Sequence, residues 1–182
     1  MRRGPIVALD VGYAPGRTLA AAAALPDWSS PAGEATHLVV SLLGPPAEYR
    51  SGAFFERELP PLLSLLSDPA RLDELLSGAR LEDAAALLVD GHAWLAPDRP
   101  GLGARLHQAL GERVPVVGVA KGAWRGSPHA VQVRRGGSRR PLFVTAAGVE
   151  AAEAAERVRS LAGAHRLPDL LRQVDALSRG RP

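Results

Sequence analysis

The chain has 182 residues, and its proportions of 46% hydrophobic and 23% charged residues are those of a soluble globular protein, which excludes a disordered or fibrous class. The absence of cysteine excludes disulfides and thiolate metal sites, so any metal must use oxygen or imidazole ligands, and we expect a cytoplasmic setting. The formal net charge is +3, and no segment approaches the roughly 18 apolar residues that a membrane span needs.

The hydrophobic pattern of the first half predicts strands separated by Gly, Pro and Asp turns at residues 5–10, 18–25 and 36–43. Apolar residues then recur at helical spacing over 54–66 and again over 72–76, and the pair Pro60-Pro61 predicts a kink or a restart. A fully apolar strand at 84–90 precedes a helix at 101–111.

The second half begins with an apolar strand at 114–121. Two further strands, at 129–134 and 141–145, flank an arginine-rich turn, and helices follow at 148–163 and 168–180. This order predicts an α/β fold with a mixed sheet flanked by helices, in a single domain over residues 1–182. We expect phosphate contacts from the turn and from two arginines near the first helix: Arg134, Arg135, Arg139, Arg140, Arg50 and Arg57.

Charged side chains stand where three of these strands end. Asp10 closes the first strand, Asp90 the fourth and Lys121 the fifth, so all three can project from one sheet edge if the strands are adjacent and parallel. Carboxylates gathered there are costly to desolvate unless they share a cation, and oxygen ligands suit Mg²⁺ or Mn²⁺. Lys121 is the only lysine beside 21 arginines, and its compact ammonium can approach a phosphate or a water more closely than a guanidinium.

A third carboxylate can come from the first helix, where Glu56 and Glu58 compete. At 100° per residue Glu58 falls close to the apolar stripe of Phe55, Leu62 and Leu66, whereas Glu56 lies further round toward solvent. The helical wheel therefore favours Glu58.

The strings around these residues resemble the endonuclease V family, whose fold is RNase H-like. IVALDVGY, YRSGAFFERELP, VDGHAWLAPDRPGLGARL, VPVVGVAK and HRLPDLLRQVDALS carry the resemblance from the first strand nearly to the C-terminus. It implies that Asp10, Glu58 and Asp90 hold Mg²⁺, with Mn²⁺ as an alternative, and that Lys121 completes the catalytic set by steadying the nucleophile or the developing phosphorane charge.

The same resemblance implies that the substrate is DNA or RNA with a deaminated base, especially inosine. Tyr49 and Gly52 would belong to a wedge that separates the strands, and a pocket would admit the extruded base. Gly91, His92 and Gly118 are the other candidates for substrate contact. We expect a monomer with no membrane partner.

The chain also departs from the family's strings. Ser51 replaces a proline of the wedge, Ala93 replaces a glycine of the loop, and residues 96–98 read Ala-Pro-Asp in place of His-Pro-Arg. Residues 146–148 read Ala-Ala-Gly where the family has a glycine–histidine pair, so the resemblance predicts that one site histidine is missing. Two hypotheses follow: a metal-dependent endonuclease, or a catalytically weakened or inactive nucleic-acid-binding module.

Overall fold

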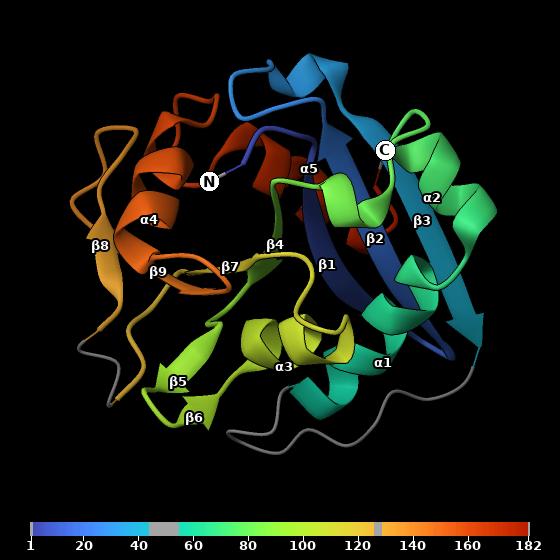
Figure 1. The fold of residues 1–182 in the computed structure, drawn as a ribbon, viewed down its shortest axis with the longest axis horizontal. Coiled ribbons are helices and arrows are strands. Elements are labelled where there is room, and N and C mark those ends of the chain that lie inside the picture. The colour runs from blue at the N-terminus through green and yellow to red at the C-terminus, as the bar shows by residue number, and fades with distance from the viewer. Residues whose placement is uncertain (1, 44–54, 126–128, 182) are drawn as a thin grey trace.

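A computed structural model describes residues 2–43, 55–125 and 129–181 (Figure 1). Seven strands form one mixed sheet in the order β3-β2-β1-β4-β7-β9-β8. Their bounds are β1 Ile6–Ala14, β2 Arg17–Leu25, β3 Thr36–Leu43, β4 Ala86–Asp90, β7 Val116–Ala120, β8 Val131–Val133 and β9 Leu142–Ala147. The central strands β1, β4 and β7 are parallel, and the remaining pairs are antiparallel.

Helices cover both faces of the sheet, which confirms the predicted α/β architecture. On one face lie α1 (Phe55–Leu66), α2 (Pro69–Leu75) and α3 (Leu102–Ala109); on the other lie α4 (Ala151–Ser160) and α5 (Asp169–Ser178) (Figure 1). Each face has its own apolar core, and side chains of β1 alternate between the two, with Ile6 and Ala8 in one and Val7 and Leu9 in the other. No helix among the described residues is long and apolar enough to cross a membrane.

The helices on both faces of the sheet explain why the strands can be recognised from the sequence. Because both faces of the central strands are buried, they are continuous apolar runs rather than alternating ones. The alanine-rich segment 20–24 is a strand because its small side chains allow helices to approach both faces closely.

Three local features differ from the sequence-based expectations. Helix α1 continues through Pro60 and Pro61, so the predicted restart does not occur. The leucines beyond the prolines are buried against the sheet, and this packing outweighs the lost hydrogen bonds. Strand β1 does not end at Asp10 but continues to Ala14, since its last residues still pair with β2. The predicted loop after β4 contains a small hairpin, β5 (Trp94–Ala96) with β6 (Arg99–Pro100), whose strands are too short to give a periodic signal.

Helix α5 lies directly on β1 at Gly12. A Cβ atom at this position would lie 1.9 Å from the carbonyl oxygen of Ser178, far inside van der Waals contact. The missing side chain therefore lets the end of α5 touch the strand that carries Asp10.

We expect Gly12→Ala to lower the free energy of unfolding by about 2 kcal/mol or more, because the added methyl group must push α5 away from β1. Gly33→Ala is the matched control, since a Cβ at Gly33 meets no atom within 4 Å. Urea unfolding of the two variants measures the difference, and equal midpoints would contradict this account of the contact.

Candidate active site

The parallel pairing of three strands brings the predicted charged residues together. In the pairing of β1 with β4, Leu9 lies opposite Val89, and the next residues along these strands are Asp10 and Asp90. In the pairing of β4 with β7, Asp90 lies opposite Val119. Neighbouring strands are about 4.8 Å apart, so Asp10 and Asp90 are direct neighbours at the carboxyl edge of the sheet. Lys121 follows the last residue of β7 on the same edge.

Lys121 is held by carboxylates from two elements. Its Nζ lies 2.7 Å from Asp90 Oδ2 and 3.9 Å from Asp175 Oδ1. Partial burial by itself would lower the pKa of the ammonium, but the hydrogen bond to Asp90 and the negative charges of Asp90, Asp175 and Asp10 outweigh it and raise the pKa. Lys121 therefore carries its positive charge throughout the physiological pH range.

Asp175 is a member of the cluster that the sequence analysis missed. It lies on α5, where Arg179 Nη2 also donates to its Oδ1 over 2.9 Å, and 29% of its side chain is exposed. In the sequence it directly follows Val174 of the buried stripe. From the sequence, Asp175 can therefore be placed at the border of the apolar face of α5. Only the packing of α5 on β1 brings its carboxylate beside Lys121.

Asp10 is oriented by Ser178, whose Oγ donates to Asp10 Oδ2 over 2.6 Å. Burial, together with the negative charges of Asp90 and Asp175, raises the pKa of Asp10 to about 6, although the Ser178 hydrogen bond opposes the shift. The Asp10 carboxylate also accepts a hydrogen bond from the backbone N–H of Val11, so two donors orient it.

Glu58 is the acid that α1 brings to the two aspartates, as the helical wheel favoured, whereas Glu56 is half-buried nearby. Only 4% of Glu58 is exposed. Burial, together with the negative charges of Asp10 and Asp90, raises its pKa to about 9, although the positive charge of Arg57 opposes the shift. Glu58 is therefore protonated at neutral pH when no cation is present.

A small cavity of about 10 Å³ is lined by Asp10, Asp90 and Asp175 on one side and by apolar side chains on the other, and Glu58 is not among its lining residues. A cavity of this volume is at the lower limit for holding one water molecule or a small ion. The oxygen-only donors and their mutual repulsion fit the chemistry of Mg²⁺. Among the described residues no group of three or more acidic or histidine side chains is already arranged around one point as metal ligands, so coordination requires these side chains to turn.

The loop after β4 covers the middle of β7. A Cβ at Gly118 would lie 2.2 Å from the backbone nitrogen of Ala93, and the Ala93 N–H donates to Thr145 Oγ1 over 2.7 Å. Gly118, a candidate for substrate contact, is thus buried beneath the loop and allows its close approach. Gly91, which begins the loop, has a φ of +116° and open space at its Cα, so it is available to a ligand.

His92 lies in the same loop near Asp90. Its Nε2 is 3.0 Å from the carbonyl oxygen of Gly122, which can only accept, so Nε2 carries the proton. Burial lowers the pKa of His92, and the imidazole is therefore neutral at physiological pH. This hydrogen bond ties the loop after β4 to the segment after Lys121.

Arg166 fixes the backbone of the lysine. Its Nη2 donates to the carbonyl oxygen of Lys121 and, over 2.6 Å, to that of Pro141. This side chain thus joins the end of β7 to the start of β9, and the sequence pattern alone gave no reason to single it out.

Residues 146–148 do not belong to the cluster. Ala146 lies opposite Val117 and Ala147 opposite Val116, whereas Phe143 lies opposite Ala120 beside the lysine. Because β9 runs antiparallel to β7, the position expected for the missing histidine is at the other end of the strand. The predicted loss therefore leaves no gap beside the aspartates.

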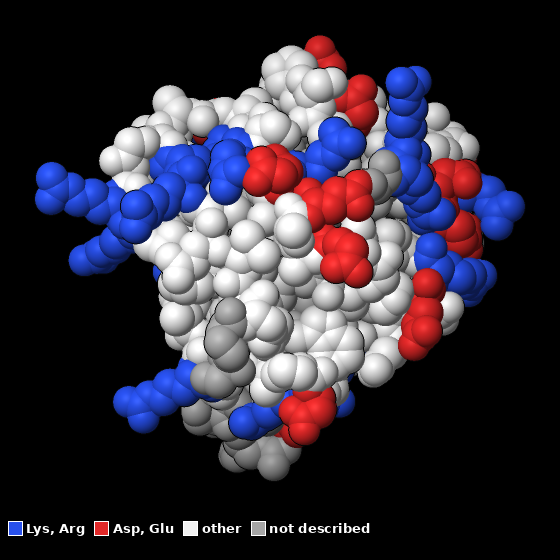
Figure 2. All heavy atoms as spheres, turned by 60° about the vertical axis from the view of Figure 1, so that its left-hand side comes forward, with Lys and Arg blue, Asp and Glu red and all other residues white. Residues whose placement is uncertain are grey.

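The arginine-rich turn joins β8 and β9, as predicted, but Arg135 differs from its neighbours. It donates to the carbonyl oxygens of Gly163 over 3.2 Å and His165 over 3.0 Å, and also to that of Leu161, so it fastens the turn to the segment after α4. Long basic side chains project from the face shown in Figure 2. The remaining candidates of the turn, which stay exposed for phosphate contact, are Arg134, Arg139 and Arg140. Tyr49, Arg50, Ser51 and Gly52 lie outside the described residues.

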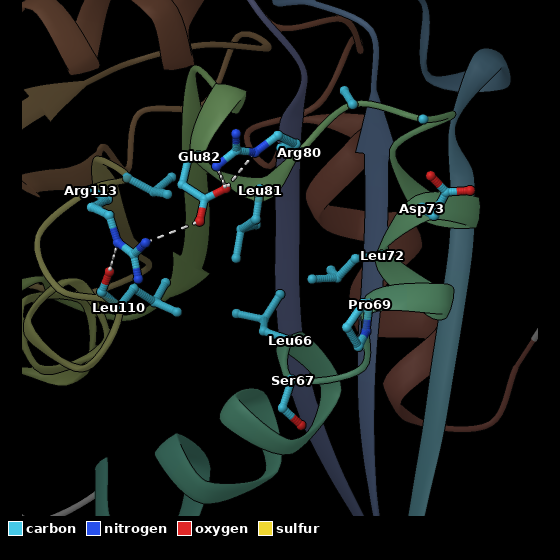
Figure 3. A pocket seen from close by; sticks show the side chains of 13 residues that line it. Leu66, Ser67, Pro69, Leu72, Asp73, Arg80, Leu81, Glu82, Leu110 and Arg113 are labelled. Carbon is cyan, nitrogen blue, oxygen red and sulfur yellow. Dashed lines mark hydrogen bonds and ion pairs between the residues drawn. The ribbon is translucent and has the colours of Figure 1, made fainter.

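A separate pocket of about 370 Å³ lies at the amino ends of β4 and β7, opposite the carboxylates (Figure 3). Leucines form its wall, and Glu82 pairs with both Arg80 and Arg113 at its mouth, at 3.4 and 3.3 Å. Its arginines are thus already matched by a carboxylate within the pocket.

No protein-family model and no curated protein sequence matches the chain. Among solved structures, human endonuclease V is similar, with 23% identity and a TM-score of 0.75 over 97% of this chain and 83% of that one. The Streptomyces avermitilis endonuclease V has 23% identity and a TM-score of 0.71 over 97% and 80%. The Ciona intestinalis enzyme, in complex with a 24mer DNA containing an inosine followed by a ribo-adenosine, has 16% identity and a TM-score of 0.75 over 97% and 85%. The chain therefore has an endonuclease V-like fold, as its motifs predicted.

The raised pKa of Glu58 predicts a pH-dependent stability. Between its unfolded value of 4.5 and its folded value of about 9, the folded protein binds a proton more tightly than the unfolded chain, so stability falls as pH rises through this window. Without metal, wild type should lose on the order of 2 kcal/mol between about pH 5 and about pH 8 that Glu58→Gln does not lose. Urea unfolding across pH measures this, with Glu56→Gln as the control that should behave as wild type.

Proposed function

We propose that the protein is a metal-dependent endonuclease that hydrolyses a phosphodiester near a deaminated base, above all inosine, in DNA or RNA. The observation that carries this proposal is the meeting of four acidic side chains and the only lysine at the carboxyl edge of parallel strands in an endonuclease V-like fold. The inosine-containing DNA bound by the Ciona intestinalis enzyme supports the choice of substrate.

Asp10, Asp90 and Glu58 would hold the cation, Mg²⁺ or Mn²⁺, and Asp175 is placed to assist them. When bound, a divalent cation supplies Lewis acidity and lowers the pKa of a water that attacks phosphorus. The raised pKa values of Asp10 and Glu58 support this assignment, because burial and the neighbouring carboxylates cause them and a bound cation would favour the ionised forms. Glu58 must release its proton to act as a ligand.

The remaining residues prepare the site for a phosphate. Ser178 would hold the carboxylate of Asp10 in its orientation through the hydrogen bond from its hydroxyl group. Lys121 pairs with Asp90, and its ammonium would donate to a phosphate oxygen if Asp90 held the cation instead. An ammonium fixed there stabilises the charge that develops on phosphorus oxygens in the transition state.

The binding module is the second candidate, because the described acidic side chains are not already arranged as metal ligands. The missing histidine lends the binding module little support, because residues 146–148 lie away from the cluster. The two candidates differ only in turnover, so a cleavage assay separates them.

We expect wild type to cleave a labelled inosine-containing strand with Mg²⁺ or Mn²⁺ and to leave the matching strand without inosine intact. Asp10→Asn should lower kcat by about 1,000-fold, and Lys121→Arg by about 100-fold, because a bulky fork cannot occupy the position of the ammonium. Asp73→Asn, an exposed acid at the pocket of Figure 3, is the matched control and should cleave as wild type.

Thermal unfolding with and without Mg²⁺ gives a second reading that does not depend on turnover. A cation at 100 times its Kd should stabilise wild type and Asp73→Asn by about 2.7 kcal/mol, and Asp10→Asn much less. If wild type binds inosine-containing strands but cleaves none with either metal, the endonuclease proposal fails and the binding module stands.

A further inference from the structure

Arginine side chains stack on aromatic rings at three places in the described part of the chain. The sequence has only eight Phe, Trp and Tyr residues, so three such stacks use a large part of its aromatic content. The distances from guanidinium carbon to ring centroid are 4.2 Å for Arg57 on Tyr13, 3.7 Å for Arg105 on Phe55 and 5.8 Å for Arg99 on Trp124.

Each stack includes a residue close in sequence to a member of the carboxylate cluster. Tyr13 follows Asp10 by three residues on β1, and burial together with the charge of Glu58 raises its pKa to about 12. Phe55 precedes Glu58 by three residues on α1, and Trp124 follows Lys121 by three residues.

The elements that carry the stacks are also adjacent in space. Arg99 belongs to β6, Arg105 to α3, and both Phe55 and Arg57 to α1. Helix α3 contacts both β6 and α1, and these elements lie along the lower part of the fold in Figure 1. The three stacks therefore form a row from β6 to the end of β1, beside the carboxyl edge of the sheet.

A stacked arginine and ring offer two kinds of contact to one ligand. The guanidinium carries N–H groups at its edge that can donate to phosphate oxygens, and a ring that does not pack on the core can offer its other face to a base. Phe55 packs against the apolar core, so Tyr13 and Trp124 are the candidate rings. Tyr13 is suited to such contact because 37% of it is exposed, which among the described large hydrophobic residues is matched only by Val39. Arg99 is exposed, and Trp124 is partly exposed.

We propose that these stacks form a track for an unpaired nucleic-acid strand that crosses the carboxylate cluster, with bases on Tyr13 and Trp124 and phosphates on the arginines. Stacking on a ring requires a base whose face is not covered by its neighbour, which a single strand offers and a regular duplex does not. The proposal deepens the proposed function and rests on it, because it takes nucleic acid as the substrate.

The test is binding measured without turnover, by fluorescence anisotropy of labelled oligonucleotides of about 20 residues in EDTA. Oligo-dT, oligo-U and a duplex of the same length are compared, so that the DNA and RNA arms are separate. Wild type should bind at least one single strand about 10-fold more tightly than the duplex. Tyr13→Leu and Trp124→Leu should each weaken that binding by about 5- to 100-fold and change duplex binding little, because leucine keeps the apolar bulk and removes the stacking face.

Arg113→Ala is the matched control, because this arginine lies at the pocket of Figure 3, away from the cluster, and its removal should leave single-strand binding unchanged. Circular dichroism and urea unfolding establish that each variant is folded. Equal affinity for single strand and duplex, single-strand binding unaffected in both leucine variants, or displacement of the strand by poly-glutamate at matched charge would each overturn the track.

Failure of the track and failure of the nuclease have different signatures. If wild type cleaves inosine-containing strands and both leucine variants bind single strands as wild type does, the track is wrong and the nuclease stands. If no cleavage occurs but the leucine variants lose single-strand affinity, the nuclease is wrong and the track stands.

Discussion

The charge imbalance around Lys121 is the constraint on which the rest of the site depends. Asp10, Glu58, Asp90 and Asp175 gather around Lys121, with Arg179 paired to Asp175 and Arg57 acting on Glu58. The acids still outnumber these cations, and two of the acids are largely withdrawn from water. Ionising all of them without a further cation is costly, so the protein keeps a proton on Glu58 and raises the pKa of Asp10. The site therefore has the electrostatic character of a cation receptor.

The close contact of α5 with β1 brings the helix into that balance. Gly12 lets the carbonyl of Ser178 approach, and the same turn of helix then supplies a hydroxyl to Asp10 and the carboxylate of Asp175 to the lysine. The helix and the strand are far apart in sequence. The close approach at Gly12 therefore brings Ser178 and Asp175 of α5 to Asp10 and Lys121 at the edge of the sheet.

Arg135 and Arg166 bind backbone carbonyls in this fold, whereas Lys121 binds a carboxylate of the site. Arg135 and Arg166 each donate to two or more backbone carbonyls, which the broad guanidinium can reach from one position, and so they fasten loops to the sheet. The task at Lys121 is different, because a compact charge must sit beside Asp90 and still leave room for a ligand. This division gives a physical reason for a single lysine among many arginines.

Sequence by itself determined the strands and the edge at which their polar residues meet. A strand buried on both faces must be apolar throughout, so an acid or a lysine at its end is conspicuous, as Asp90 and Lys121 are. The stripe of α1 likewise favoured Glu58. Tertiary structure alone decided the place of Asp175, the covering of Gly118 and the distance of residues 146–148 from the cluster. These depend on how helices and loops pack between segments far apart in the chain, and local periodicity carries no information about that packing.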